Sequence, residues 1–186
     1  MWGATSKTPV FSSLKEAVHL AKGKDVTVVD RQVVHGGDAN ESYKLKLSDG
    51  GALFLKANSI SNADFFRAEA EGIAAIKSTK AVRVPDIYAV GTDDGYSFLL
   101  MEYVERAGFA PDFWETLGLC LANMHMADTS LFVHEGKYGF QSDNYIGAGV
   151  QKNTPKSGWI EFFSECRLRP QFELASKYFD EKVIHC

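Results

Sequence analysis

The chain has 186 residues, of which 45% are hydrophobic and 24% are charged, and its formal net charge is −4. This composition excludes a disordered or fibrous protein and indicates one compact domain or two very small ones. Because the charge is negative and no lysine- or arginine-rich block occurs, we expect no nucleic-acid partner.

The sequence also argues against a membrane segment and a cysteine-based site. No apolar run approaches the length of a membrane span, so we expect no membrane partner. Cys120, Cys166 and Cys186 are odd in number and far apart, which predicts neither a disulfide framework nor a zinc site. We therefore expect a reducing, cytoplasmic location. The acid-free segment Met1–Lys15 leaves an organelle transit peptide open as an alternative.

Hydrophobic patterning predicts one helix and then five strands with a second helix among them. Ser13 and Glu16 form a capping-box pattern, which predicts a helix that ends at Gly23. Runs that are rich in β-branched residues or alternate between apolar and polar residues predict strands over 26–34, 41–47, 52–58, 87–90 and 97–103. The period changes to that of a helix over 64–77, between the third and fourth strands.

The second half of the chain is expected to be mainly helical. Apolar spacing predicts a helix from Phe113 to Met126. His125 near its end is expected to pack in a core. The polar stretch 144–155 predicts a long loop, and 159–178 predicts a helical region that is broken near Pro170.

Three features in succession point to a nucleotide site. Glycines between two strands let backbone N–H groups approach an anion, a strand lysine can be held by a helix glutamate, and an apolar strand can present its end to a planar base. Alone, each has an ordinary explanation as a hairpin turn, a surface ion pair or a buried strand. Their order along the chain, however, is that of the small lobe of the protein-kinase fold.

Several separate segments resemble the fructosamine-3-kinase family in the same order, over about residues 24 to 178. In the first half these are GGDANESY from Gly36, FLKAN from Phe54, FRAEAEG from Phe66 and VRVP from Val82. In the second half they are LGLCLANMH from Leu117, Gly139-Phe140, DNYIG from Asp143, QKN from Gln151, WIEFF from Trp159 and Arg167-Leu168.

The resemblance implies an α+β, protein-kinase-like fold. Residues 1–103 would form an antiparallel five-stranded small lobe with one inserted helix, and 104–186 the first, mainly helical part of the large lobe. It also implies an ATP- and Mg²⁺-dependent kinase that phosphorylates the sugar of fructosamines or ribulosamines, which are ketosamine adducts of protein amines. Such phosphorylation leads to deglycation, so ATP and a glycated amine or protein are the expected partners.

The resemblance implies roles for ten residues. By analogy, Lys56 would contact the nucleotide phosphates and Glu69 would orient it. Gly36, Gly37 and Asn40 would lie over the phosphates. The remaining residues are Met101, Glu102 and Tyr103, which would line the base through backbone bonds and packing, and Asn144 and Gln151, which would contact sugar or peptide.

The family's catalytic loop, a His-Gly-Asp segment followed by an Asn, does not occur in this sequence. None of the five histidines precedes Gly-Asp, so we name no catalytic base and no metal ligand. We expect a truncated chain, whether fragment, gene-model artefact or pseudokinase, with little or no kinase activity alone and weak nucleotide binding at most. An apolar patch at Phe162, Phe163, Phe172 and Phe179 is expected to favour self-association.

Two alternatives stay open. The first is a non-catalytic pseudokinase or scaffold that uses the fold to bind a nucleotide or a protein partner. The second is a different small-molecule kinase of the same fold, of the aminoglycoside or choline type, which the fructosamine-like loop segments argue against.

Overall fold

The structure is a computed structural model that describes residues 8–35 and 40–178. The chain divides into two compact units, Met1–Ala127 and Asp128–Cys186, which are described one at a time. The lobe boundary predicted between residues 103 and 104 stays a prediction. In the parts described, no helix combines the length and the apolar character that a membrane crossing needs.

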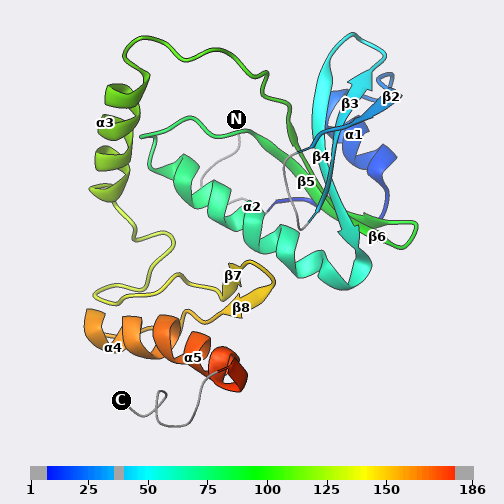
Figure 1. Cartoon of the computed structure of the whole chain (residues 1–186). Helices are drawn as coiled ribbons and strands as arrows, with labels where there is room; N and C mark the ends of the chain where they lie inside the picture. Colours follow the sequence, from blue (N-terminus) through cyan, green and yellow to red (C-terminus); the bar gives the residue numbers. More distant parts are fainter. Residues whose placement is uncertain (1–7, 36–39, 179–186) are drawn as a thin grey trace. The chain divides into compact units, whose positions relative to one another are not determined.

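A six-stranded sheet forms the centre of the first unit (Figure 1). Its strands, in spatial order, are β1 (Val10–Phe11), β5 (Ile87–Asp93), β6 (Tyr96–Glu102), β4 (Ala52–Ser59), β3 (Glu41–Leu47) and β2 (Val28–Val33). Neighbouring strands are antiparallel, except that β1 runs parallel to β5. The five predicted strands are confirmed, but the prediction of a five-stranded sheet was wrong. The sixth, β1, has two residues and is too short to show a period.

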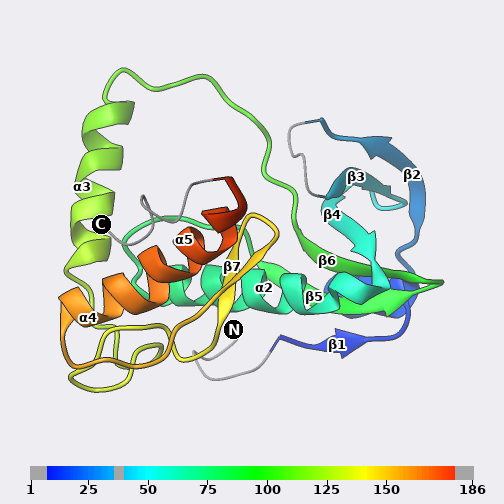
Figure 2. The same ribbon diagram turned by 60° about the horizontal axis from the view of Figure 1, so that its bottom comes forward.

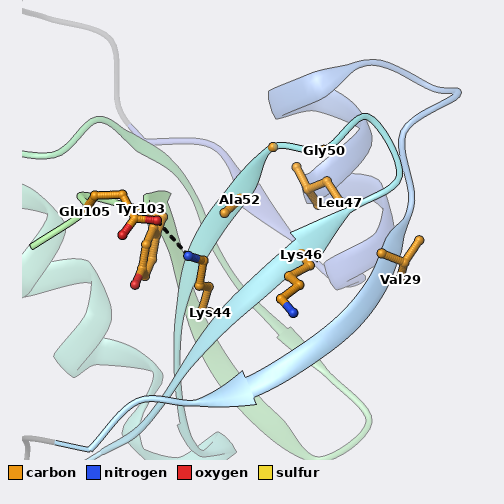
Figure 3. A pocket seen from close by; sticks show the side chains of 9 residues that line it. Val29, Lys44, Lys46, Leu47, Gly50, Ala52, Tyr103 and Glu105 are labelled. Atoms are coloured by element: carbon orange, nitrogen blue, oxygen red, sulfur yellow. Dashed lines mark hydrogen bonds and ion pairs between the residues drawn. The ribbon is translucent and has the colours of Figure 1, made fainter.

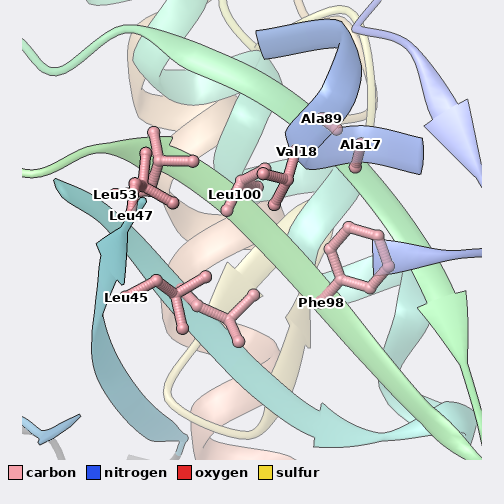
Figure 4. Packing of buried hydrophobic residues seen from close by; sticks show 9 residues of the cluster. Ala17, Val18, Leu45, Leu47, Leu53, Ala89, Phe98 and Leu100 are labelled. Carbon is pink, nitrogen blue, oxygen red and sulfur yellow. The ribbon is translucent and has the colours of Figure 1, made fainter. Parts of the chain in front are cut away.

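One face of the sheet packs against α1 (Leu14–Lys22). Strand alternation puts Leu45 of β3 opposite Leu53 of β4, and both are buried. The helix contributes Ala17 and Val18 to the same cluster, which Figure 4 shows together with Phe98 and Leu100 of β6. This cluster holds the first helix against the sheet.

The opposite face of the sheet packs against α2 (Ala63–Ser78), which follows a single 3₁₀ turn, η1 (Ile60–Asn62). Phe66 and Ala70 of the helix are buried against Leu99 and Met101 of β6. In Figure 2 this helix runs alongside β5. Strand β6 is therefore buried on both faces, as its continuous apolar sequence predicts.

The start of α1 differs from its prediction. Ser13 is the N-cap residue, but its side chain makes no capping bond, so the capping box with Glu16 is absent. Instead, the Leu14 amide donates to Asp93 Oδ2 at 2.7 Å. Asp93 ends β5 beside a tight turn in which Asp94 and Gly95 both have positive φ, of 43° and 84°. A carboxylate from a distant turn thus replaces the local cap.

Helix α3 (Phe113–His125) contains no buried residue. His125, in its last turn, is exposed, so the prediction that it packs in a core was wrong. Apolar spacing predicts the helix itself but does not identify which residues of another element would cover it.

The second unit contains a hairpin and a continuous helical run. Strands β7 (Asn144–Ile146) and β8 (Gly149–Gln151) pair where a loop was predicted, because strands of three residues are too short to show a strand period. The helical run consists of α4 (Trp159–Phe163), the π-helical turn η2 (Ser164–Leu168), α5 (Arg169–Ala175) and the 3₁₀ turn η3 (Ser176–Tyr178).

Pro170 changes the type of helix rather than ending it. Because proline has no N–H, it cannot donate to the Cys166 carbonyl one turn earlier. That carbonyl instead accepts from Arg167 Nη1 at 2.9 Å, and the Arg169 amide donates to the Ser164 carbonyl. The predicted break near Pro170 is therefore a local π-helical turn.

Candidate functional site

A lysine–glutamate ion pair joins the sheet to α2 in the first unit. Strand alternation puts Lys56 of β4 on the face that α2 covers, because its neighbours Leu55 and Ala57 are buried on the other side. The Lys56 Nζ atom lies 2.7 Å and 2.8 Å from the two carboxylate oxygens of Glu69. The Lys56 side chain is 22% exposed and the Glu69 side chain is 32% exposed. The ammonium group is thus held in one orientation and remains accessible to a ligand.

A chain of three asparagine side chains lies next to this ion pair. The Asn58 amide nitrogen donates to Asn40 Oδ1 at 2.7 Å, and the Asn62 amide nitrogen donates to Asn58 Oδ1 at 3.0 Å. Asn40 was predicted to lie over phosphates, whereas Asn58 and Asn62 were not identified from the sequence. Gly36 and Gly37, also predicted there, lie outside the described residues.

The end of β6 is more constrained than the sequence suggests. Met101 is buried with 6% of its surface exposed. The Glu102 amide donates to the Asp86 carbonyl at 2.8 Å, and its carboxylate accepts from Arg83 Nη2 at 2.5 Å. A base that used the Glu102 N–H would have to break the bond to Asp86. The predicted backbone contacts at this position stay a prediction.

A cavity of about 430 Å³ opens beside Tyr103 (Figure 3). Lys44 of β3 lies with its Nζ atom 4.1 Å from the centre of the Tyr103 ring and 2.7 Å from Glu105 Oε1. The hydrogen bond to Glu105 raises the pKa of Lys44. The other residues lining the cavity are Val29, Lys46, Leu47, Gly50, Gly51 and Ala52.

Lys44 and Glu105 were not identified from the sequence. The alternation of lysines with apolar residues along β3 indicated only a solvated face of the sheet. Their contact depends on the chain after β6 returning beside β3, and the two residues are 61 positions apart. No pattern within either segment contains that information.

The cavity and the ion pair lie on the same face of the sheet. Lys44 is opposite Phe54, and Ala52, Phe54 and Lys56 alternate along β4 toward α2. At about 3.3 Å per residue, Ala52 and Lys56 are separated by roughly 13 Å. A ligand with a planar group at one end and an anionic group at the other fits this spacing.

The two predicted substrate residues belong to the second unit, where they bind each other. Asn144 and Gln151 are cross-strand partners in the hairpin, and Gln151 Nε2 donates to Asn144 Oδ1 at 2.8 Å. Next to them, Asp143 accepts from Lys152 Nζ and from the Asn153 amide, both at 2.8 Å. These bonds lower the pKa of Asp143, the Lys152 ammonium contributing most.

Arg167 connects this hairpin to the helical run. Its Nη2 atom donates to Asn153 Oδ1 at 2.6 Å, its Nη1 atom donates to the Lys152 carbonyl at 2.6 Å, and its guanidinium lies 4.5 Å from the centre of the Phe162 ring. Burial lowers the pKa of Arg167. Asn153 itself is only 3% exposed. The segment that directly follows the hairpin is therefore bonded to the helical run.

Two features of the described residues could together hold a nucleotide. Lys56 provides a fixed cation for phosphate oxygens, and the cavity beside Tyr103 provides room for a base. Over the same residues, 8–35 and 40–178, no cluster of three or more His, Cys, Asp or Glu side chains is placed to hold a metal.

Similarity to known proteins extends over most of the chain. The family model described as fructosamine kinase matches residues 10–183. The chain belongs to the fructosamine kinase family. It is 36% identical over 167 residues to the chloroplastic protein-ribulosamine 3-kinase of Oryza sativa subsp. indica, covering 89% of this chain and 47% of that protein. A protein from Synechocystis sp. named "Probable ketoamine kinase" is 32% identical, covering 90% of this chain and 55% of that protein.

Solved structures of this family confirm the predicted α+β, protein-kinase-like fold. A protein from Haemophilus somnus 129PT named as a fructosamine-3-kinase superposes with a TM-score of 0.80 at 24% identity, over 92% of this chain and 58% of that one. A protein from Thermobifida fusca, also named as a fructosamine-3-kinase, superposes with a TM-score of 0.71 at 26% identity, over 94% of this chain and 58% of that one. This chain spans about half the length of the curated relatives it matches.

Proposed function

We propose that this chain forms the nucleotide-binding part of an ATP-dependent kinase whose substrates are fructosamines or ribulosamines on proteins. The observation that carries the proposal is the ion pair in which both carboxylate oxygens of Glu69 hold Lys56 Nζ. The names of the relatives, ribulosamine 3-kinase and ketoamine kinase, support the substrate class. Phosphorylation of the sugar would start deglycation of the protein.

The chemistry of phosphoryl transfer explains why this ion pair is useful. The protein contributes mainly by positioning the phosphates and neutralising their charge. A free lysine side chain has many rotamers, whereas Lys56 is already held by Glu69 before a nucleotide arrives. The base would lie in the cavity beside Tyr103, roughly 13 Å away along β4.

The 186 residues are expected to bind Mg·ATP without transferring phosphate. A general base and Mg²⁺ ligands are needed for transfer, and the sequence has no His-Gly-Asp segment that would provide the base. Nucleotide binding needs only the cation and the base cavity. Asn144 and Gln151 are proposed to contact the sugar or peptide through the outer edge of the hairpin.

Calorimetric titration of Mg·ATP into the chain tests the nucleotide site. Lys56→Met is expected to weaken binding about 10- to 100-fold, because hydrogen bonds to charged groups contribute about 1.5–3 kcal/mol. Lys156→Met is the matched control, since Lys156 also pairs with carboxylates, those of Glu161 and Glu165, but in the second unit. A ketosamine phosphorylation assay on the same sample is expected to show no turnover.

Each outcome of this experiment has a definite meaning. Equal ATP affinity in the Lys56→Met and Lys156→Met variants would contradict the phosphate-binding role of Lys56. A folded chain that binds no ATP would favour the alternative, a scaffold that binds a protein partner. Turnover by the 186 residues would contradict the expectation that a His-Gly-Asp segment is indispensable.

We further propose that the chain self-associates through exposed apolar side chains of the second unit. Phe163 and Phe172, which were predicted to form such a patch, are 40% and 58% exposed. Phe162, predicted with them, is only 4% exposed and packs beneath Arg167, so it is not part of the patch. Phe179 lies outside the described residues. Ile160, at 82% exposure, joins the exposed set.

A further inference from the structure

The chain of asparagine side chains joins three elements of the first unit. Residue pairs Glu41 with Ala57 and Ser42 with Lys56 set the register of β3 and β4. Continuing this register, Asn40 lies opposite Asn58, and the two side chains bond at 2.7 Å. Asn62 then connects Asn58 to the start of α2.

The bonds determine how the Asn58 amide is oriented. Its Oδ1 atom accepts from the Ser59 amide at 2.7 Å and from Asn62 Nδ2 at 3.0 Å. Its Nδ2 atom is therefore the one that faces Asn40 Oδ1. A reversed amide would place donors against donors and an acceptor against an acceptor, which is unfavourable at these distances. The three side chains act as one connected unit.

Asn62 makes this connection instead of capping its own helix. It is the N-cap residue of α2, where an asparagine side chain usually accepts a bond from a free helix N–H. Here it makes no capping bond. Such a bond contributes about 1 kcal/mol to helix stability. The side chain of Asn62 is thus used to hold α2 to β4.

The asparagine chain and the ion pair connect the same two elements on the same side. Asn62, the N-cap residue, lies seven positions before Glu69 of α2, which is close to two helical turns, so their side chains lie on one side of the helix. Lys56 and Asn58 are two residues apart on β4 and also share a face. Rotation or sliding of α2 on the sheet would break both connections.

We propose that Asn58 and Asn62 are positioning residues of the nucleotide site. They hold Asn40 on the phosphate-binding side and set α2 so that Glu69 meets Lys56. Neither contacts the base cavity, so they act on the phosphate end of the ligand alone. The inference rests on the proposed nucleotide site, and it assigns these two side chains a part in it.

Comparing ATP with adenosine tests this inference, because adenosine lacks the phosphates. Asn62→Ser is the informative variant, since serine is a good neutral N-cap but is too short to reach Asn58. We expect ATP affinity to fall about 3- to 10-fold, in line with one hydrogen bond of about 0.5–1.5 kcal/mol. Adenosine affinity, measured by NMR titration, and the melting temperature are expected to stay unchanged.

Two further variants complete the experiment. Asn58→Ala is expected to lower ATP affinity at least as much as Asn62→Ser, and the double variant no more than Asn58→Ala alone, because both act through one connection. Asn123→Ser is the matched control, on the exposed surface of α3. It should change neither affinity.

The outcomes separate this inference from the proposed function. If Lys56→Met weakens ATP binding but Asn62→Ser leaves the ratio of ATP to adenosine affinity unchanged, only the positioning role is wrong. Equal losses for ATP and adenosine would also overturn it, because they indicate a general loss of structure. If Lys56→Met itself leaves ATP affinity unchanged, the proposed nucleotide site is wrong. The asparagine side chains then have no nucleotide-positioning role.

Discussion

Asp143 is a carboxylate whose protonation is linked to the stability of the second unit. Lys152 and the Asn153 amide both bond to it and lower its pKa below the ordinary value of 3.8. A lowered pKa in the folded state stabilises the fold above the unfolded-state pKa, and this stabilisation is lost as pH falls through the folded-state pKa. Glu165 behaves in the same way because Lys156 bonds to it.

Asp143→Asn is therefore expected to reduce the acid sensitivity of the chain. At pH 7 the loss should be below about 1 kcal/mol, since the ion pair with Lys152 is largely exposed. The variant and the parent should converge only as pH falls through the folded-state pKa of Asp143, which lies below 3.8. Urea unfolding at pH 3, 5 and 7 measures this, with exposed Asp25→Asn as the control. An unchanged pH profile in Asp143→Asn would contradict the linkage.

At the level of single residues, the sequence predicts the Lys56–Glu69 ion pair but not the asparagine side chains beside it. Lys56 and Glu69 can be matched because a strand lysine and a helix glutamate follow a recognisable order along the chain. Asn58 and Asn62 belong to a short polar segment that resembles any strand-to-helix connection. Their role depends on Asn40, which is brought near only by the pairing of β3 with β4.

Among the elements, the β1–β5 contact depends on one glycine. A Cβ atom added at Gly91 would lie 2.3 Å from the Phe11 carbonyl oxygen and 2.7 Å from the Phe98 ring. The Phe98 ring is fully buried and cannot give way, and the Phe11 carbonyl belongs to the backbone of β1. Strand β1, with two residues, is the part that would be displaced.

Gly91→Ala is expected to lower the free energy of unfolding by about 1–3 kcal/mol, as is typical of an overpacked core. Gly118→Ala is the control, since a Cβ atom there meets nothing within 4 Å inside helix α3. Alanine is the better helix former, so this control should gain up to about 1 kcal/mol. Chemical denaturation of both variants measures the difference. A stable Gly91→Ala chain would show that β1 is not needed for the fold.

Strands are predicted best where alternation is long and one face is buried. The bounds of β3 agree with the prediction residue for residue, because Tyr43, Leu45 and Leu47 alternate with polar residues. The hairpin β7–β8 has three-residue strands without alternation, and it was predicted as a loop. Bonds between the residues that flank it support it: Asn153 bonds to Ser142 and Asp143, and Arg167 bonds to Lys152 and Asn153. Such contacts are tertiary and leave no local pattern.

At the scale of the whole molecule, exposed apolar surface predicts self-association. Sedimentation velocity over a concentration series is expected to show larger species as concentration rises. The variants Ile160→Ser and Phe172→Ser should shift the distribution toward the monomer, because each removes a large exposed side chain from the second unit. Ile60→Ser is the control, being 52% exposed but in the first unit. A concentration-independent monomer would contradict the proposal.

The bond between the Leu14 amide and Asp93 has a consequence for the order of folding. It joins residues 79 positions apart, and it replaces a local cap on a helix of nine residues. A helix this short is marginal in isolation. The carboxylate is in place only after β5 and β6 have formed their hairpin. Although α1 leaves the ribosome before the strands on which it packs, it becomes stable only once they are paired.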